Sequence, residues 1–236
     1  MGGLVVGSVG TFDVVALNRA VGIGIDSPAS EDEVRRVVSL FDQSGSRRHA
    51  IQVCPSASTP DTIALLEEQG FNHFNNWTKL YRKAAGDVFE PDTSYHVEEI
   101  GRSRSKIFAD IVCPAFGWPG LLRQWVAALV GREGWRHYIA YDGDQPVSTG
   151  AMFIRGGIAW FGFAATDPGH RRRGAQSVLI HRRLLDAQVA GCESIVVETA
   201  EDKPEKPNPS YHNLIRFGFS MAYQRPNYLR IKESHE

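Results

Sequence analysis

The most distinctive pattern of apolar and polar positions lies between Gly157 and Gly191. Residues 157–166 are apolar at almost every position, which predicts a strand that is buried on both faces. The Asp-Pro-Gly sequence at 167–169 ends this strand. From Ser177 onward the apolar side chains recur at helical spacing, and Gly191 stands where a helix would end. The pattern therefore predicts a strand, a loop and a helix in that order.

The loop between this strand and helix is basic and contains small residues. In order, it reads His170, Arg171, Arg172, Arg173, Gly174, Ala175 and Gln176. A helix N-terminus attracts phosphate through its unpaired amides and its dipole, and Gly174 and Ala175 would let a phosphate approach the backbone. The loop is either a site for a phosphate-bearing cofactor or a solvent-exposed basic helix start. It lacks the Gly-Lys-Ser/Thr of a P-loop and the later glycines of a dinucleotide fingerprint.

This loop resembles the acetyl-CoA loop of the GNAT superfamily of N-acetyltransferases, which reads Arg/Gln-x-x-Gly-x-Gly/Ala. Residues 171–175 fit that pattern, and Gln176 stands in place of its last small residue. The resemblance continues through SIVVETAE and NPSYHNLIRFGF and covers most of residues 95–236. It implies an α/β fold with a mixed, mostly antiparallel central sheet flanked by helices, and acetyl-CoA as cosubstrate.

The resemblance also implies where the coenzyme would be held. The residues expected to bind it are Phe163, Ala164, Ala165, Thr166, Arg171, Arg172, Arg173, Gly174, Ala175, Gln176, Ser177, Asn208 and Asn213. In the family the fourth and fifth strands splay apart around the pantetheine arm. An amide within residues 163–166 is therefore the expected donor to the oxyanion of the tetrahedral intermediate.

An internal repeat divides the chain. LLEEQGFNHFNNWTKLYRK is similar to NLIRFGFSMAYQRPNYLRIK, with the Gly-Phe pair at 70–71 matching the pair at 218–219. The first copy has DSPASED where the second has the arginine loop, and acidic groups there would repel a pyrophosphate. We therefore predict two tandem GNAT-like domains joined by a linker at Ala84–Thr93. Residues 1–88 would form a degenerate copy without the cofactor loop, and residues 94–236 the N-acetyltransferase domain.

The first copy shows shorter periodic segments. Strands are expected at Leu4–Val9, Asp13–Ala16, Ala20–Ile25 and His49–Cys54, and two short strands between Asn72 and Lys83. Ser30 and Glu33 form a capping box before a helix that is predicted to stop near Gly45.

In the second copy, residues 103–130 are predicted to be helical in two pieces. The breaks are expected at Cys113-Pro114 and at Trp118-Pro119-Gly120. Phe116 and Trp118 lie in this arm, where they would either pack in the core or line a substrate site.

Composition and charge narrow the function classes. The 236 residues are 42% hydrophobic and 22% charged with a net charge of −1, as in an ordinary soluble globular protein, which argues against nucleic acid or a membrane as a partner. Residues 1–92 carry a net charge of −4 and residues 93–236 one of +3, which suits an anionic cofactor in the second copy.

The three cysteines are far apart, so we expect no disulfide framework and a cytoplasmic location. No cluster has metal-ligand spacing.

Two residues are candidates for proton transfer. Glu198 follows an apolar strand and is either a general base, directly or through water, or an edge carboxylate paired with an arginine. Family members often place a tyrosine four residues before the Gly-Phe pair as the acid for the thiolate, and here that position is Leu214. Tyr211 lies three residues earlier on about the same helical face, so it either takes that role or packs with its hydroxyl bonded locally.

The second copy contains further candidates. Asn208 would cap the helix that follows or bond the cofactor amide, and Asn213 would touch the pantetheine. The loop at 201–209 is charged and rich in proline, and it is either a lid or simply mobile.

Together these features predict an acyl-CoA-dependent N-acyltransferase, most simply one that moves acetyl from acetyl-CoA to a primary amine by direct attack in a ternary complex. The acceptor would be a small molecule or a peptide amine. A non-catalytic CoA-binding or regulatory protein is the alternative, and the oligomeric state, including a homodimer, is left open.

Overall fold

The computed structural model describes residues 3–10 and 12–232, which form two compact units. The first unit runs up to Thr78 and also takes the residues from Tyr223 onward, whereas the second covers Lys79–Ala222. These boundaries differ from those expected at 88 and 94, because the last strand of each repeat is shared between the units. No helix among the described residues is long and apolar enough to span a membrane.

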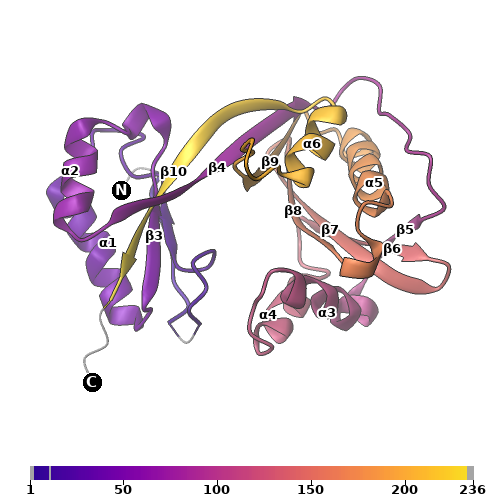
Figure 1. Cartoon of the computed structure of the whole chain (residues 1–236), viewed down its shortest axis with the longest axis horizontal. Coiled ribbons are helices and arrows are strands. Elements are labelled where there is room, and N and C mark those ends of the chain that lie inside the picture. The colour runs from indigo at the N-terminus through magenta and orange to yellow at the C-terminus, as the bar shows by residue number, and fades with distance from the viewer. Residues whose placement is uncertain (1–2, 11, 233–236) are drawn as a thin grey trace. The chain divides into compact units, whose positions relative to one another are not determined.

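The first unit is a small mixed sheet covered by two helices (Figure 1). Its elements are β1 (Val5–Gly7), β2 (Arg19–Val21), α1 (Glu31–Ser44), β3 (Arg48–Gln52), a short 3-10 turn (Pro55–Ala57), α2 (Pro60–Glu68), the start of β4 (Asn72–Lys83) and the end of β10 (Ser220–Ile231). β3 pairs parallel to β2 and antiparallel to β10. Val34, Val37 and Phe41 of α1 pack with Leu66 of α2 onto Ile51 of β3, which forms the core of this unit.

The predicted capping box of α1 is confirmed, since the Ser30 hydroxyl accepts a hydrogen bond from the Glu33 amide at 3.2 Å. Gly45 ends the helix in the left-handed region, with φ of 76°. The prediction of a strand at Asp13–Ala16 is wrong, because this segment forms turns.

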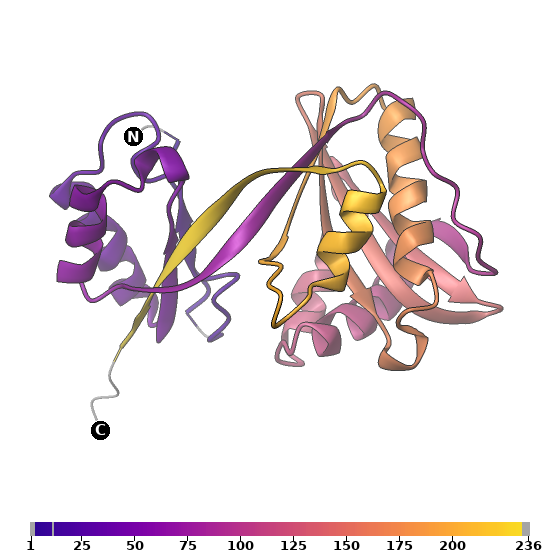
Figure 2. The ribbon, with the colours of Figure 1, turned by 45° about the horizontal axis from the view of Figure 1, so that its top comes forward.

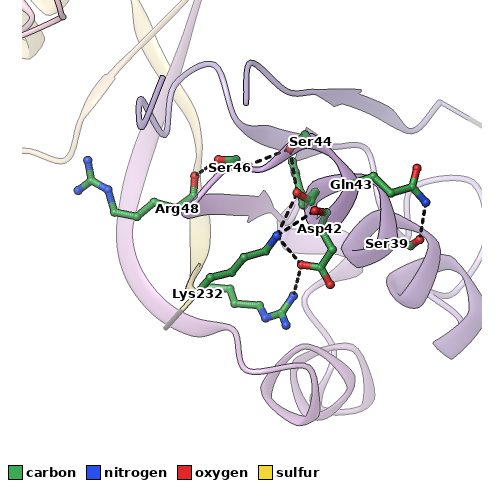
Figure 3. A network of polar contacts seen from close by, with 9 residues as sticks. Ser39, Asp42, Gln43, Ser44, Ser46, Arg48 and Lys232 are labelled. Atoms are coloured by element: carbon green, nitrogen blue, oxygen red, sulfur yellow. Dashed lines mark hydrogen bonds and ion pairs between the residues drawn. The ribbon is translucent and has the colours of Figure 1, made fainter. Parts of the chain in front are cut away.

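The C-terminal end of α1 is held by residues at the end of β10 and just after it (Figure 3). The Lys232 ammonium lies 2.9 Å from the Asp42 carboxylate and donates to the carbonyls of Phe41 and Asp42 at 3.3 and 3.2 Å. Arg230 also reaches Asp42, at 3.3 Å. The last turn of α1 contains no basic residue, so Arg230 of β10 and Lys232 after it supply the cations that suit a helix C-terminus.

The second unit has one twisted sheet with helices on both faces (Figures 1 and 2). Its elements are β5 (His96–Ile100), a short 3-10 turn (Arg102–Arg104), α3 (Ser105–Ala115), α4 (Leu122–Leu129), β6 (Trp135–Asp142), β7 (Gln145–Arg155), β8 (Ile158–Thr166), a 3-10 turn (Pro168–His170), α5 (Ala175–Val189), β9 (Ser194–Ala200) and α6 (Pro209–Arg216), with the ends of β4 and β10 that belong to this unit. The strand order is β4-β9-β8-β7-β6-β5, and the pairings from β5 to β8 are antiparallel, whereas β8 and β9 are parallel. This is the mixed, mostly antiparallel architecture that the resemblance implied.

The core of this unit lies under α5 and α6. Leu179 and Leu184 of α5 and Leu214 of α6 pack on Phe161 and Ile195 of the sheet. The opposite face of the sheet carries α3 and α4. Pro114 does not break α3, because it lies in the last turn, whereas the predicted break at 118–120 is present.

The strand predicted as two short pieces between Asn72 and Lys83 is instead continuous, because its two halves serve different units. β10 divides in the same way. Gly70 lies beside the Arg230 side chain in the first unit, and Gly218 lies beside the Arg82 side chain in the second, with 3.7 Å from the added Cβ position to Nε in both cases. The two copies of the repeat therefore exchange the ends of their last strands.

Candidate functional site

The central strand β8 loses one neighbour halfway along its length. Its pairing with β9 runs from Ile158 opposite Ser194 to Phe161 opposite Val197 and ends there, although both strands continue. Pairing with β7 continues past a bulge, where the register shifts between Thr149 and Ala151. β8 and β9 therefore part where the resemblance expects the pantetheine arm.

The bulge falls on the predicted oxyanion segment. Neither Phe163 nor Ala164 is paired in register with a residue of β7 or β9, and Phe163 has a φ of 51°, which is costly for a large side chain. The Thr149 hydroxyl donates to the Phe163 carbonyl at 3.0 Å, and the Ser148 hydroxyl donates to the Ala165 carbonyl at 2.7 Å. The carbonyls of Phe163 and Ala165 are thus satisfied from β7, and Phe163 and Ala164 lie outside the regular ladder.

The basic loop leads directly into α5. The first bond of the helix runs from the Val178 amide to the Gly174 carbonyl, so the amides of Ala175, Gln176 and Ser177 have no intrahelical partner. Gly174 has a φ of 92°, and a Cβ there would lie 3.2 Å from the Thr93 hydroxyl. A glycine is therefore required both by the turn and by the space. α5 begins at Ala175, two residues before the predicted start.

The Gln176 side chain points toward the sheet. Its amide nitrogen lies 2.8 Å from the Ser148 hydroxyl, 3.1 Å from the Thr166 hydroxyl, and 3.1 Å from each of the carbonyls of Thr149 and Ala165. The residue that departs from the family pattern thus fastens the start of α5 to β7 and β8 beyond the bulge. Its backbone amide stays at the mouth of the helix.

The three arginines of the loop are exposed, and no carboxylate of the described chain forms a salt bridge with them. Arg171 also lies 3.4 Å from the Thr166 carbonyl. A further guanidinium, which the sequence analysis missed, comes from α6. Arg216 donates to the Ser177 hydroxyl at 3.1 Å and to the Asn213 side chain at 2.7 Å. Only its position in the last turn of a short helix could have suggested it.

Glu198 lies near the end of β9 and is largely buried. Its carboxylate is 2.7 Å from the Lys79 ammonium, with 10% of the glutamate side chain exposed. The ion pair holds the Glu198 carboxylate against β4. The partner is a lysine from β4, where the sequence analysis considered an arginine.

The residues of α6 divide between packing and exposure. Leu214, at the usual tyrosine position, is 4% exposed and belongs to the core, whereas Tyr211 is half-buried against the same core. The Asn208 side chain accepts from the amides of Ser210 and Tyr211 and donates to the Thr199 hydroxyl and the Ala200 carbonyl. Asn208 is thus an N-cap, and its donor and acceptor atoms are all used.

His170 begins the basic loop, and only 14% of its side chain is exposed. It lies between Asp142 and Asp167, at 3.6 and 3.5 Å. The histidine therefore belongs to the turn before α5.

The comparisons with known proteins address this unit directly. Residues 112–201 match the family model of the acetyltransferase (GNAT) domain. The matched segment includes the bulged strand, the arginine loop and Glu198. This part of the chain is therefore similar to a GNAT acetyltransferase domain.

Solved structures extend the likeness of the GNAT domain to both units. A GCN5-related N-acetyltransferase from Kribbella flavida is 16% identical with a TM-score of 0.67, covering 94% of this chain and 84% of that one. A tandem GNAT protein from the clavulanic acid biosynthesis pathway is 13% identical with a TM-score of 0.63, covering 92% and 76%. A fungal GCN5-related glucosamine N-acetyltransferase region is 10% identical with a TM-score of 0.61, covering 95% and 30%. These likenesses show the fold, and no curated protein matches the chain.

Proposed function

We propose that the protein is an acyl-CoA-dependent N-acyltransferase, most simply one that transfers acetyl from acetyl-CoA to a primary amine. The observation that carries the proposal is the open mouth of α5. In the part of the chain that the structure describes, the amides of Ala175, Gln176 and Ser177 have no intrahelical partner, exposed arginines flank them, and β8 parts from β9. This arrangement suits a diphosphate with an extended arm.

The proposed reaction is direct attack in a ternary complex. The amine nitrogen bonds to the acyl carbon, the oxyanion takes a hydrogen bond from an amide of the bulged segment, and the carbon–sulfur bond then breaks. The proton lost by the amine ends on the thiolate in the net reaction. Glu198 is the proposed base, acting directly or through a water, and Tyr211 is the proposed acid.

The first test is binding of the cosubstrate. Acetyl-CoA should raise the melting temperature of the protein, whereas ATP should not. Changing Arg171 and Arg173 together to alanine should weaken CoA binding, since both cations are proposed to neutralise the diphosphate. Unchanged affinity in that double variant would count against the loop as the cofactor site.

The second test separates catalysis from binding. Release of free thiol should be measured over a panel of amines that includes glucosamine, because one structural neighbour acts on it. Tyr211→Phe should slow turnover and leave CoA affinity unchanged. If acetyl-CoA binds but no amine releases thiol, the alternative of a non-catalytic CoA-binding protein holds. The buried Leu214 at the usual tyrosine position favours that alternative.

A further inference from the structure

A cluster of aromatic rings covers the sheet face of the second unit opposite α5. We call the following residues the aromatic cluster: Phe108, Phe116, Trp118, Trp125, Trp135, Phe153, Trp160 and Phe163. They come from α3, the turn after it, α4 and the strands β6, β7 and β8. Only Phe116 and Trp118 stand close enough together in the sequence to be noticed there, because the rings are scattered over about fifty positions of the chain.

The register of the sheet gathers the rings of the strands. Trp135 is paired with Phe153, and Phe153 with Trp160, so their side chains project from one face in one row. The positive φ of Phe163 accompanies the bulge, and its ring joins the same face. Its centroid lies 5.8 Å from that of Trp135 and 6.3 Å from that of Trp160. Phe163 is thus both part of the oxyanion segment and the centre of the aromatic cluster.

The helical arm adds rings from the other side. Phe108 and Trp118 each have their centroids 6.3 Å from that of Phe163. Trp118 also contacts Phe116 and Trp125, which are 46% and 40% exposed. The aromatic cluster is therefore not sealed like the core under α5, and it presents aromatic surface to solvent beside the predicted acyl position.

A buried histidine at the base of the aromatic cluster has no hydrogen-bond partner. His137 is 1% exposed, and neither ring nitrogen is bonded within the described residues. Its ring stacks on Trp135 at 5.4 Å and meets the edge of Phe108 at 4.9 Å. Burial lowers the pKa of His137 to about 4, so the ring is neutral at physiological pH. A buried acceptor without a partner is costly.

The arm beside the aromatic cluster offers no unpaired carboxylate to a polycation among the described residues. Asp110 is the acidic residue of the arm at 101–130, and it already holds Lys106 at 2.6 Å and Arg123 at 3.1 Å. Tryptophan and phenylalanine rings bind planar apolar groups through edge and face contacts. Surfaces of this kind also favour the neutral amine, which is the form that attacks a thioester.

We propose that the aromatic cluster binds the acceptor and that the acceptor is a primary amine carried on an aromatic body, such as an arylalkylamine. This inference rests on the proposed N-acyltransferase function. Phe163 connects the acceptor site with the acyl-transfer site, because it belongs to the aromatic cluster and to the segment that would face the acyl group. The amine of a substrate stacked on the aromatic cluster would reach the thioester from the side of the arm.

The test compares amines on the intact protein. Thiol release from acetyl-CoA should show a higher kcat/KM for 2-phenylethylamine than for glucosamine or spermidine. Trp118→Leu should raise the KM for 2-phenylethylamine about tenfold, the size of one aromatic contact, and leave acetyl-CoA affinity unchanged. Trp77→Phe, in the first unit, is the matched control and should change neither value. Quenching of tryptophan fluorescence by 2-phenylethylamine should weaken in Trp118→Leu and persist in Trp77→Phe.

The possible outcomes distinguish a failure of the aromatic-acceptor inference from a failure of the proposed N-acyltransferase function. If acetyl-CoA binds and glucosamine or spermidine is the better acceptor, the aromatic-acceptor inference is overturned and the N-acyltransferase function stands. An equal effect of Trp118→Leu on all three amines would overturn it as well. If acetyl-CoA neither binds nor reacts, both fail together.

Discussion

Gln176 illustrates how a single departure from a family pattern is accommodated. Where the family has a small residue, this chain has a long amide that meets four acceptors on β7 and β8. Two of these acceptors, Ser148 and Thr149, also hold carbonyls of the bulged strand. The side chain therefore leaves the helix mouth clear and fixes α5 to the segment that would hold the oxyanion.

Gln176→Ala should consequently affect both stability and geometry at the site. Loss of these partly buried hydrogen bonds should lower the free energy of unfolding by about 1–3 kcal/mol, measured by urea denaturation. Acetyl-CoA affinity should also fall, since the amides of α5 would lose their fixed position. Gln124→Ala, an exposed glutamine of α4, is the control and should change neither quantity. A Gln176→Ala protein of full stability would contradict the role of the amide as an anchor.

His137 should make stability depend on pH. Burial lowers its folded-state pKa from 6.5 to about 4, so the unfolded chain binds a proton that the folded chain does not as pH falls between these values. The free energy of unfolding is therefore not reduced by protonation of His137 above about pH 6.5. It decreases as the pH falls from there toward 4. Between pH 7.5 and pH 5, we expect His137 to account for a loss of about 2 kcal/mol.

His137→Phe should remove this part of the pH dependence in urea denaturation at the two pH values. His73→Gln, at an exposed position, should retain it. His49 in the first unit is buried with a pKa of about 4 for the same reason, so it should leave a second, independent slope. If the free energy of unfolding of His137→Phe changes with pH as much as that of the unmodified chain, His137 has the same pKa in the folded and unfolded states.

Gly162 is required by its neighbour Trp160. A Cβ on Gly162 would lie 2.0 Å from the indole ring, so Gly162→Ala must displace that ring from the aromatic cluster. We expect a loss of about 1–3 kcal/mol in the free energy of unfolding and a shift in tryptophan emission. Gly101→Ala is the control, because nothing lies within 4 Å of its Cβ position. An unshifted emission spectrum in Gly162→Ala would mean that Trp160 is not in contact with Gly162.

At the scale of elements, sequence patterns predict the bounds of a helix or strand correctly where those bounds are set by residues close together in the chain. The start of α1 is an example, because Ser30, Glu33 and the apolar positions that follow are all within reach of one another. The strand β4 is the opposite example. Its midpoint has no local feature that marks a change of unit, so its sequence was interpreted as two strands.

Ser30→Ala should remove the N-cap of α1. The expected loss is about 1 kcal/mol in the free energy of unfolding, because the Glu33 amide would lose its acceptor. Ser30→Asp retains an acceptor and should be close to the unmodified protein. Equal destabilisation by both variants would point to a role for the serine other than capping.

At the scale of the molecule, the exchange of strand ends makes the first unit depend on residues at the end of β10 and just after it. β10 pairs with β3 from Asn227 opposite Gln52 to Ile231 opposite Arg48, and Lys232 binds the end of α1. A domain boundary drawn between the repeats would separate β10 from β3. The first unit would then lose one strand of its sheet and the cations at α1.

Truncation after Ala222 should therefore expose the first unit to proteolysis at α1 and α2, as followed by mass spectrometry of the fragments. Lys232→Ala is the milder variant and should lower the free energy of unfolding by about 1 kcal/mol. Lys206→Ala, in the loop of the second unit, is the matched control. A truncated chain that resists protease as well as the full chain would contradict the assignment of β10 to the first unit.

The sequence by itself determined the resemblance to the GNAT superfamily, the order of most elements, the repeat and the basic loop, because each of these depends on residues close together in the chain. Only the tertiary structure decided that the repeats exchange strand ends, that Gln176 faces the sheet and that Glu198 pairs with Lys79. It also decided that rings from six segments gather in the aromatic cluster. These features depend on strand register and on contacts between residues far apart in sequence. A periodic pattern fixes which face a side chain occupies within its element, but the partner it meets there is fixed by how the elements pair.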